Sequence, residues 1–294
     1  FMDKNIMGLR GSNLRMSHLL IYDVFRYVAE NLVLSAKCDT KNGNSGALNQ
    51  RTVLFDEMTM GQIMAGFPDL YGFPHQLLAV FLVSEIDQLT CVPYIDAVES
   101  YGLPADCCPV PSSECGALVT DSLPHMGSCF LSSSMPCDGS TMASSYYSRR
   151  FPNVPVFHLC FPVRYMDEET VQMGAEDIKA CIKFIEERTG AKWSWDAYFK
   201  QIKRFNMETD YELQKWEVNK SAYPQLLGPC YELFRKWNYE MDGGADPRTI
   251  KTFEKVNDLL MKAYANKEEP WPGKMKYRAI VWSCPAHYYA NFSN

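Results

Sequence analysis

Two cysteines stand where the sequence predicts loops at one edge of a parallel sheet. The apolar run 128–134 breaks into a Pro-Cys-Asp-Gly turn that contains Cys137, a pattern typical of a buried strand that ends at the carboxyl edge of a sheet. α/β proteins place their functional sites at that edge. Cys108 stands upstream in the proline-rich segment Cys-Pro-Val-Pro. Because soft metals prefer thiolate ligands, two thiols in predicted loops of one domain indicate a metal site.

Each of these cysteines has a structural alternative. Cys137 can be a buried thiol at the end of a strand, and Cys108 competes as a ligand with Cys107 and Cys115. A free thiol inside an apolar segment behaves as a small hydrophobic side chain. Cys284, at the end of a later predicted strand, can line an active-site cleft, but a structural role is favoured. We expect core packing for the cysteines inside predicted strands or helices, Cys129, Cys160 and Cys181.

The total of 11 cysteines in 294 residues argues against a secreted disulfide framework. The number is odd, the chain is large, and several cysteines lie in apolar segments. We therefore expect a reduced, cytoplasmic protein. A chain with 15 methionines as well as 11 cysteines suits the cytosol of an anaerobe, because both residue types are sensitive to oxidation.

Other catalytic motifs are missing from the sequence. The histidines have no HxxxH or HxH spacing, so a zinc site is not expected. Ser132, Ser133 and Ser134 lack the Gly-x-Ser-x-Gly pattern of a nucleophile, and we expect a strand-end serine that donates hydrogen bonds to sulfur at the metal site or to substrate. His125 and His287 fall near predicted sheet ends, where a structural role is favoured over a substrate contact. The absence of a Walker A sequence assigns any ATP hydrolysis to a partner.

Composition limits the class of protein. The net charge of −6 and the pI near 5.5 give no basic field for a nucleic-acid backbone. No apolar run approaches the roughly 20 residues that a membrane-spanning helix needs, and no charged-then-apolar leader precedes the globular pattern. With 47% hydrophobic and 22% charged residues, the chain can bury a sizeable core and is expected to hold more than one domain.

Apolar periodicity predicts an α/β fold. Two strands, 128–133 and 154–161, are separated by a helix that includes 142–149, which predicts a βαβ unit and a Rossmann-like parallel sheet. Upstream segments read as helices, at 17–33, 73–87 and 93–101.

Long amphipathic helices follow the predicted sheet. Apolar residues at helical spacing predict helices at 168–188, 194–220 and 247–265, with Ser194 as an N-cap and Gly190 as a left-handed C-cap. Residues 276–287 read as the first strand of a second α/β domain. The sequence thus predicts an α/β domain at 1–165 that carries Cys108 and Cys137, a helical segment at 166–273, and the start of a second α/β domain at 274–294. Because only seven residues follow His287, we expect a missing carboxyl-terminal portion.

These motifs occur in the same order in a known family. The matching elements are Cys108–Gly116, the Cys-Asp-Gly turn at 137–139, the strand at 154–159, the helix at 177–190 with its Ile-x-Phe-Ile-Glu-Glu-Arg-Thr-Gly segment, and the strand at 277–285. Over about residues 93–294 the chain resembles the 2-hydroxyacyl-CoA dehydratases, whose superfamily includes benzoyl-CoA reductase subunits. The 2-hydroxyglutaryl type, in its catalytic subunit, looks most similar.

The resemblance implies a heterodimer of two related subunits, each with Rossmann-like domains and a [4Fe-4S] cluster held by three cysteines. Cys108 and Cys137 match two of these ligands, which should bring their sulfurs to within about 6–7 Å of each other. The third family ligand lies beyond the equivalent of Cys284. A separate ATP-dependent iron–sulfur activator protein supplies one electron to the family's cluster.

The reaction that the family carries out explains the need for a cluster. Water leaves an (R)-2-hydroxyacyl-CoA to give the 2-enoyl-CoA, although the β-hydrogen is hardly acidic. One-electron reduction to a ketyl radical makes the elimination possible. Two alternatives stay open, a benzoyl-CoA reductase-type subunit and a non-catalytic subunit for electron transfer or assembly. The segment Gly8–Arg15, with two glycines and two arginines, can hold a phosphate of CoA or form a solvated turn.

Overall fold

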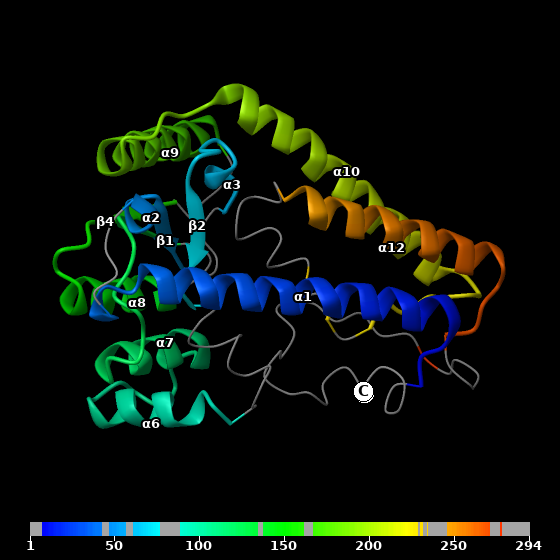
Figure 1. The fold of residues 1–294 in the computed structure, drawn as a ribbon, viewed down its shortest axis with the longest axis horizontal. Helices are drawn as coiled ribbons and strands as arrows, with labels where there is room; N and C mark the ends of the chain where they lie inside the picture. Colours follow the sequence, from blue (N-terminus) through cyan, green and yellow to red (C-terminus); the bar gives the residue numbers. More distant parts are fainter. Residues whose placement is uncertain are drawn as a thin grey trace. The chain divides into compact units, whose positions relative to one another are not determined.

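The chain forms two compact units in a computed structural model (Figure 1). The described residues are 8–42, 47–56, 61–76, 89–134, 138–161, 167–228, 230–231, 234, 246–270 and 277. The helical unit comprises Phe1–Ala29, Phe199–Tyr239 and Gly244–Asn294, and the sheet unit comprises Glu30–Tyr198 and Glu240–Gly243. The domain boundaries suggested by the sequence, at residues 165 and 273, stay predictions.

The sheet unit is built on four short parallel strands. Their bounds are β1 Thr52–Phe55, β2 Tyr71–Pro74, β3 Cys129–Ser133 and β4 Val156–Leu159. The spatial order is β2-β1-β3-β4, and each neighbouring pair is parallel. The strand order reverses between β1 and β3, which is the switch point of a doubly wound α/β sheet. The predicted Rossmann-like α/β fold and its βαβ unit are confirmed.

The first two strands differ from the sequence prediction. We expected a helix from residue 73, but Phe73 and Pro74 close β2, and β1 lies in a region for which no strand was predicted. A strand buried on both faces shows no apolar and polar alternation, so four buried residues such as those of β1 give a weak signal. Pro74 is tolerated because β2 is an edge strand.

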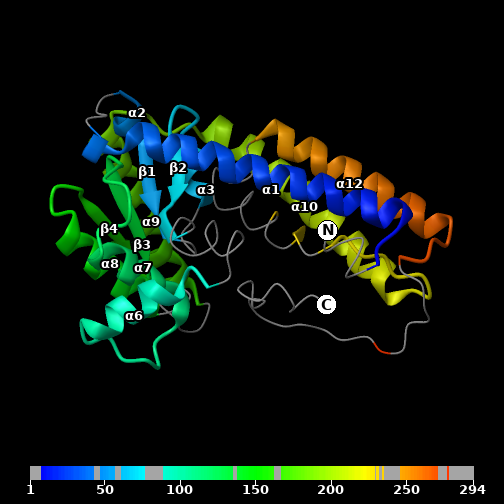
Figure 2. The same cartoon turned by 60° about the horizontal axis from the view of Figure 1, so that its bottom comes forward.

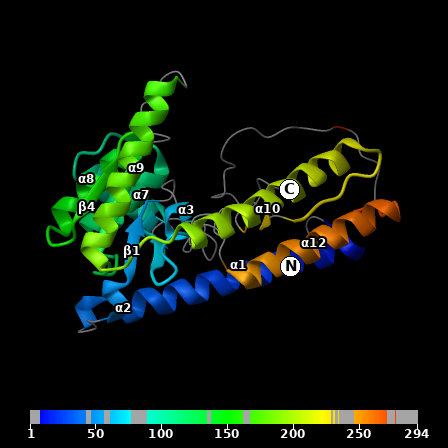
Figure 3. The ribbon, with the colours of Figure 1, turned by 90° about the horizontal axis from the view of Figure 1, so that it is seen from above.

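Helices cover both faces of this sheet. On one face, Val53 and Leu131 belong to a buried apolar cluster with Cys181 and Ile185 of α9 (Glu168–Thr189). On the other face, the ring of Phe130 stacks on Tyr147 of α8 (Asp138–Arg150), with ring centroids 4.3 Å apart. Figures 1 and 3 show α9 over one face of the sheet, and Figure 2 shows α8 with its neighbours on the other face.

The remaining elements of the sheet unit flank these layers. They are the helices α6 Val92–Ser100 and α7 Pro109–Val119, and the short turns η2 Thr40–Asn42, α2 Ala47–Gln50 and α3 Gly61–Met64. α7 packs against both α6 and α8. Gly116 permits the close approach of α6, because a Cβ at this position would lie 1.9 Å from the carbonyl oxygen of Tyr94.

Three long helices dominate the helical unit. They are α1 Gly11–Cys38, α10 Trp195–Lys220 and α12 Pro247–Ala265, of which α1 and α10 continue into the sheet unit. The Arg26 guanidinium of α1 pairs with Asp246, the N-cap of α12, at 2.8 Å and donates to Thr249 Oγ1 at 3.0 Å. Asn257 of α12 donates to Gln214 of α10 at 3.1 Å. Side-chain hydrogen bonds therefore hold α12 to both of its neighbours.

The helices predicted at 17–33, 93–101, 168–188, 194–220 and 247–265 are confirmed, and so are the two predicted caps. Ser194 Oγ accepts the N–H of Ala197 at the start of α10, and Gly190 ends α9 with a φ of 75°. The predicted strand at 276–287 lies outside the described residues, apart from residue 277. Within the described ranges, no helix is long and apolar enough to cross a lipid bilayer.

A cluster of charges closes the amino edge of the sheet unit. Asp121, just beyond α7, pairs with Lys41 at 2.9 Å, with His125 at 2.8 Å and with Arg150 at the end of α8. The hydrogen bond from His125 is the largest of the effects that hold the pKa of Asp121 well below its usual range, followed by the bonds from Lys41 and Arg150. Asp121 therefore ties the ends of α7 and α8 together.

We expect Asp121→Asn to make the protein less sensitive to acid. A carboxylate whose pKa is lowered by folding contributes stability above its unfolded pKa of about 3.9, and this contribution is lost as the pH falls below that value. Because the cluster is partly exposed, the loss at pH 7 should be about 1 kcal/mol or less. Thermal unfolding from pH 7 to pH 3 measures the effect, with the exposed Asp96→Asn as the control. Equal acid sensitivity in Asp121→Asn and the wild type would contradict this role.

Candidate functional site

Polar side chains gather at the carboxyl edge of the sheet. Asp56 follows β1 directly, is fully buried, and accepts the N–H of Ser133 at the end of β3, 3.2 Å from its Oδ2. The Asp56 N–H in turn donates to the carbonyl of Leu131. These bonds join the ends of β1 and β3 at the switch point, the position at which doubly wound sheets bind their ligands.

Cys108 is an exposed thiol at the start of α7. It is the N-cap of that helix, with a φ of −57° and a ψ of 130°, and its side chain makes no capping hydrogen bond. The following Pro109 restricts Cys108 to this extended conformation. The predicted loop position of Cys108 is confirmed, and the positive end of the α7 dipole favours a negatively charged group there.

α7 and α8 run in the same direction along one face of the sheet. Cys115 in the middle of α7 shares a buried cluster with Ala143 of α8, and Asp121 beyond the end of α7 pairs with Arg150 at the end of α8. The spacing from Cys115 to Asp121 along the first helix is nearly the same as the spacing from Ala143 to Arg150 along the second. The two helices therefore begin towards the same edge of the sheet, α7 at Pro109 and α8 at Asp138.

Cys137 itself lies outside the described residues. It is joined to Asp138 by one peptide bond, as Cys108 is joined to Pro109. The distance between the two sulfurs stays a prediction. Among the residues that the structure does describe, no three His, Cys, Asp or Glu side chains converge on a metal position.

Two of the three cysteines that were predicted to pack in the core are buried. Cys129 in β3 and Cys181 in α9 are buried, and so is Cys115, the competitor of Cys108 within α7. Burial raises the pKa of Cys129 to about 11 and also raises the pKa of Cys115 and of Cys181. Thiols of this kind are poor metal ligands, because the thiolate is the form that binds. Cys107 is half-buried, and Cys284 lies outside the described residues.

Cys160 corrects the sequence prediction of a core position. β4 ends at Leu159, two residues earlier than expected, so Cys160 lies just beyond the strand and is exposed. Its backbone N–H donates to Asp177 Oδ2 of α9 at 2.7 Å. Because the strand is shorter than predicted, Cys160 lies at the carboxyl edge of the sheet and not in the core.

The predicted strand-end serines bond to neighbouring parts of the chain. Ser132 Oγ donates to the Ser140 carbonyl at 3.4 Å and lies 3.2 Å from His158 Nδ1. Ser134 Oγ accepts the N–H of Phe161 at 3.0 Å. His125 lies at the amino edge in the Asp121 cluster, which gives it the structural role that was favoured. His287 lies outside the described residues.

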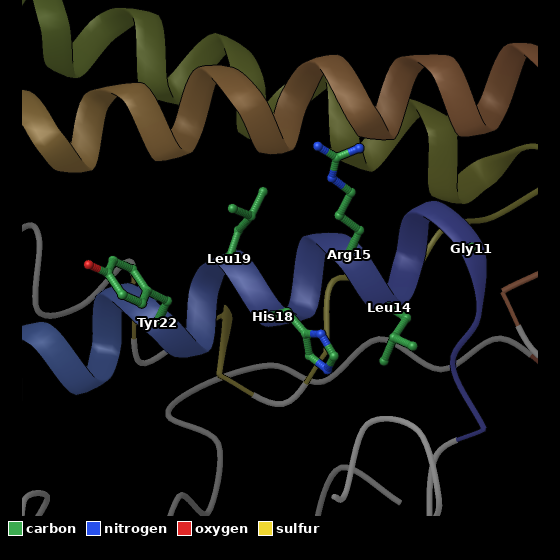
Figure 4. A pocket seen from close by; sticks show the side chains of 6 residues that line it. All are labelled: Gly11, Leu14, Arg15, His18, Leu19 and Tyr22. Atoms are coloured by element: carbon green, nitrogen blue, oxygen red, sulfur yellow. The ribbon is translucent and has the colours of Figure 1, made fainter.

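The segment Gly8–Arg15 begins α1 in the helical unit. Ser12 donates from its N–H and its hydroxyl to the two carboxylate oxygens of Glu268, at 3.1 and 3.0 Å. A carboxylate of the chain therefore already occupies this helix N-terminus. An open pocket of about 450 Å³ lies beside it, lined by Gly11, Leu14, Arg15, His18, Leu19 and Tyr22. Figure 4 shows that Arg15 and His18 project in different directions, so these two side chains do not form a common phosphate site.

Sequence reasoning missed a buried polar pair near the carboxyl edge. His75, directly after β2, lies with its Nδ1 2.9 Å from Glu114 Oε1 of α7, and both side chains are fully buried. Asp56 was missed as well. Both Asp56 and His75 follow a short apolar segment, which is a usable signal, and Glu114 is the one charged residue within the α7 sequence.

Comparison with known proteins places the chain in a family. The family model for the 2-hydroxyglutaryl-CoA dehydratase D-component matches residues 88–293, a range that includes both Cys108 and Cys137. No curated protein matches the chain. The match covers well over half of the sequence and confirms the resemblance carried by the cysteine motifs and the βαβ unit. The chain therefore belongs to the 2-hydroxyglutaryl-CoA dehydratase D-component family.

Proposed function

We propose that this chain is a subunit of a [4Fe-4S] 2-hydroxyacyl-CoA dehydratase in which Cys108 and Cys137 are two ligands of the cluster. The parallel packing of α7 and α8 carries the proposal, because it brings the helix starts that follow these two cysteines to the same edge. The D-component family supports a dehydratase subunit. The third ligand is left unassigned.

The residues present fit such a cluster. Cys108 offers an exposed thiol without a capping bond, and thiolates are the ligands that iron–sulfur clusters use. Two parallel helix N-termini at one edge add a positive potential, which favours an anionic group. Burial raises the pKa of the neighbouring cysteines of α7 and β3, which makes them weaker candidates for ligands than the exposed Cys108.

The chemistry of the reaction requires such a group. The β-hydrogen of a 2-hydroxyacyl thioester is hardly acidic, so a positioned side-chain base alone is insufficient. A cluster held by Cys108 and Cys137 would supply a low-potential electron and a Lewis acid for the thioester carbonyl. The chain's own part is to hold the cluster through its thiols at the carboxyl edge and to present the substrate to it there.

Replacing a ligand cysteine should remove most of the bound iron and the cluster absorbance. We expect this for Cys108→Ala and for Cys137→Ala, because each deletes one thiolate. Cys107→Ala is the matched control on the neighbouring residue, and Cys181→Ala is a buried control that should only loosen packing. Iron and sulfide assays on anaerobically purified protein measure the outcome. Full cluster content in Cys108→Ala, with loss of the cluster in Cys107→Ala, would show that Cys107 is the ligand and that the assignment to Cys108 is wrong.

Dehydration should need prior activation by an ATP-driven iron–sulfur protein. Only catalytic amounts of the activator are expected, because the elimination of water consumes no electron overall. Oxygen should abolish activity irreversibly. The assay supplies a 2-hydroxyacyl-CoA, a reductant and the activator, and then omits ATP. Undiminished turnover by never-activated enzyme would refute the radical reaction. Reduction of an aryl-CoA ring instead would indicate a benzoyl-CoA reductase-type subunit, and a cluster without substrate turnover would indicate an electron-transfer subunit.

The chain should be isolated with a partner. The name D-component designates one part of a multi-component enzyme, and we expect the partner to be a homologous second subunit. Obligate interfaces of such pairs commonly bury on the order of 2,000 Å² or more. Size-exclusion chromatography with light scattering on anaerobically purified protein should show a hetero-oligomer. A monomer with full dehydratase activity would be incompatible with this expectation.

A further inference from the structure

The helix α7 is buried along most of its length. Residues 111–118 are all buried, whereas Cys108 and Pro109 at its start are exposed. Close packing holds this helix in place, and the approach of Gly116 to the backbone of Tyr94 is one such contact. A buried polar contact adds a directional constraint to this packing, and it bears on where the exposed start of the helix lies.

Glu114 supplies the charged group for such a contact. It is the one charged residue of α7, six residues after Cys108, and its side chain is fully buried. Its partner is His75, which follows the edge strand β2, with 2.9 Å between Glu114 Oε1 and His75 Nδ1. Within the described residues, Glu114 Oε2 and His75 Nε2 have no other hydrogen-bond partner. Each side chain therefore depends on the other.

Aromatic rings fix the imidazole from two further elements. The His75 ring meets Tyr147 of α8 edge to face, with ring centroids 5.0 Å apart and an interplanar angle of 89°. It meets Phe130 of β3 in the same way, at 5.9 Å and 87°. His75 thus contacts residues of β3, α7 and α8. The hydrogen bond to Glu114 therefore links α7 to both the sheet and the neighbouring helix.

We propose that the buried His75–Glu114 pair is a positioning contact that sets α7 on the sheet and thereby places Cys108 beside the start of α8. This inference rests on the proposed function, in which Cys108 is a cluster ligand. A buried carboxylate without a partner is costly, so any rotation or slide of α7 that separates the pair is penalised. His75 and Glu114 act through Cys108 and touch neither cluster nor substrate.

Three variants separate positioning from stability. His75→Leu leaves Glu114 without a partner, and His75→Asn keeps an amide N–H close to the position of Nδ1. The double variant His75→Leu with Glu114→Leu replaces both partners by apolar groups, a change that is often neutral for stability. Ile185→Ala is the control, because Ile185 is a fully buried residue of α9 and belongs to the apolar cluster on the opposite face of the sheet.

Two measurements are made on anaerobically purified full-length protein with its partner. The first is the iron and sulfide content after reconstitution, together with the electron paramagnetic resonance signature of the reduced cluster. The second is the rate at which iodoacetamide modifies Cys108 in cluster-free protein, followed by peptide mass mapping. Thermal unfolding gives the stability of every variant.

We expect His75→Leu and the double variant to lose at least fivefold in cluster content and to change the Cys108 modification rate at least threefold. The double variant should do so although its thermal midpoint is close to that of the wild type. His75→Asn should restore both measurements to within twofold of the wild-type values. Ile185→Ala should be destabilised without either change.

A double variant with normal cluster content and a normal Cys108 modification rate would overturn the positioning role. So would an Ile185→Ala variant that loses as much cluster as His75→Leu. If the modification rate changes but Cys108→Ala keeps its cluster, the positioning contact stands and the ligand assignment fails.

Discussion

The parallel register of β1 and β3 is the constraint on which the site depends. Val53 lies opposite Cys129 and Phe55 opposite Leu131, which turns these side chains to the face covered by α9. Because all strands of the sheet run in one direction, their carboxyl ends meet at one edge. Asp56 is buried at that edge and needs a partner, which it finds in the N–H of Ser133. The strand register and the polar contacts of the edge therefore support each other.

The two faces of the sheet bury different kinds of side chain. The face under α9 is lined by apolar residues and cysteines, including Cys181 and Ile185. The face under α7 and α8 holds the His75–Glu114 pair among aromatic rings. Apolar packing on the first face stabilises the fold with little directional preference. The second face adds directional contacts, and it is the face whose helices begin beside the candidate ligands.

The sequence was sufficient for the parts of the fold whose signals are local. The βαβ unit of β3, α8 and β4 followed from apolar runs, and the caps of α9 and α10 followed from Gly190 and Ser194. β1 and β2 were missed because four-residue buried strands have no alternating pattern. Cys160 was misassigned because the end of β4 was placed two residues too late.

The contact between His75 and Glu114 could not be predicted from local sequence patterns, for a different reason. The two residues are 39 positions apart in the chain, and only the tertiary fold brings β2 and α7 together. A lone glutamate in an apolar helix can lie on a solvated face or in the core, and the sequence of α7 does not decide between them. Cys108 was predictable because a cysteine followed by proline must lie in extended backbone outside the helix interior.

The prolines at the start of α7 also bear on what this helix can bind. Pro109 and Pro111 have no N–H, so in the first three helical residues only Val110 can donate a backbone hydrogen bond. A phosphate site at a helix N-terminus uses several such donors. The dipole of α7 still favours negative charge, but a phosphate would find few hydrogen bonds there, whereas a thiolate of Cys108 brings its own covalent attachment. The start of α7 is therefore better suited to hold a metal through sulfur than to bind a phosphate group.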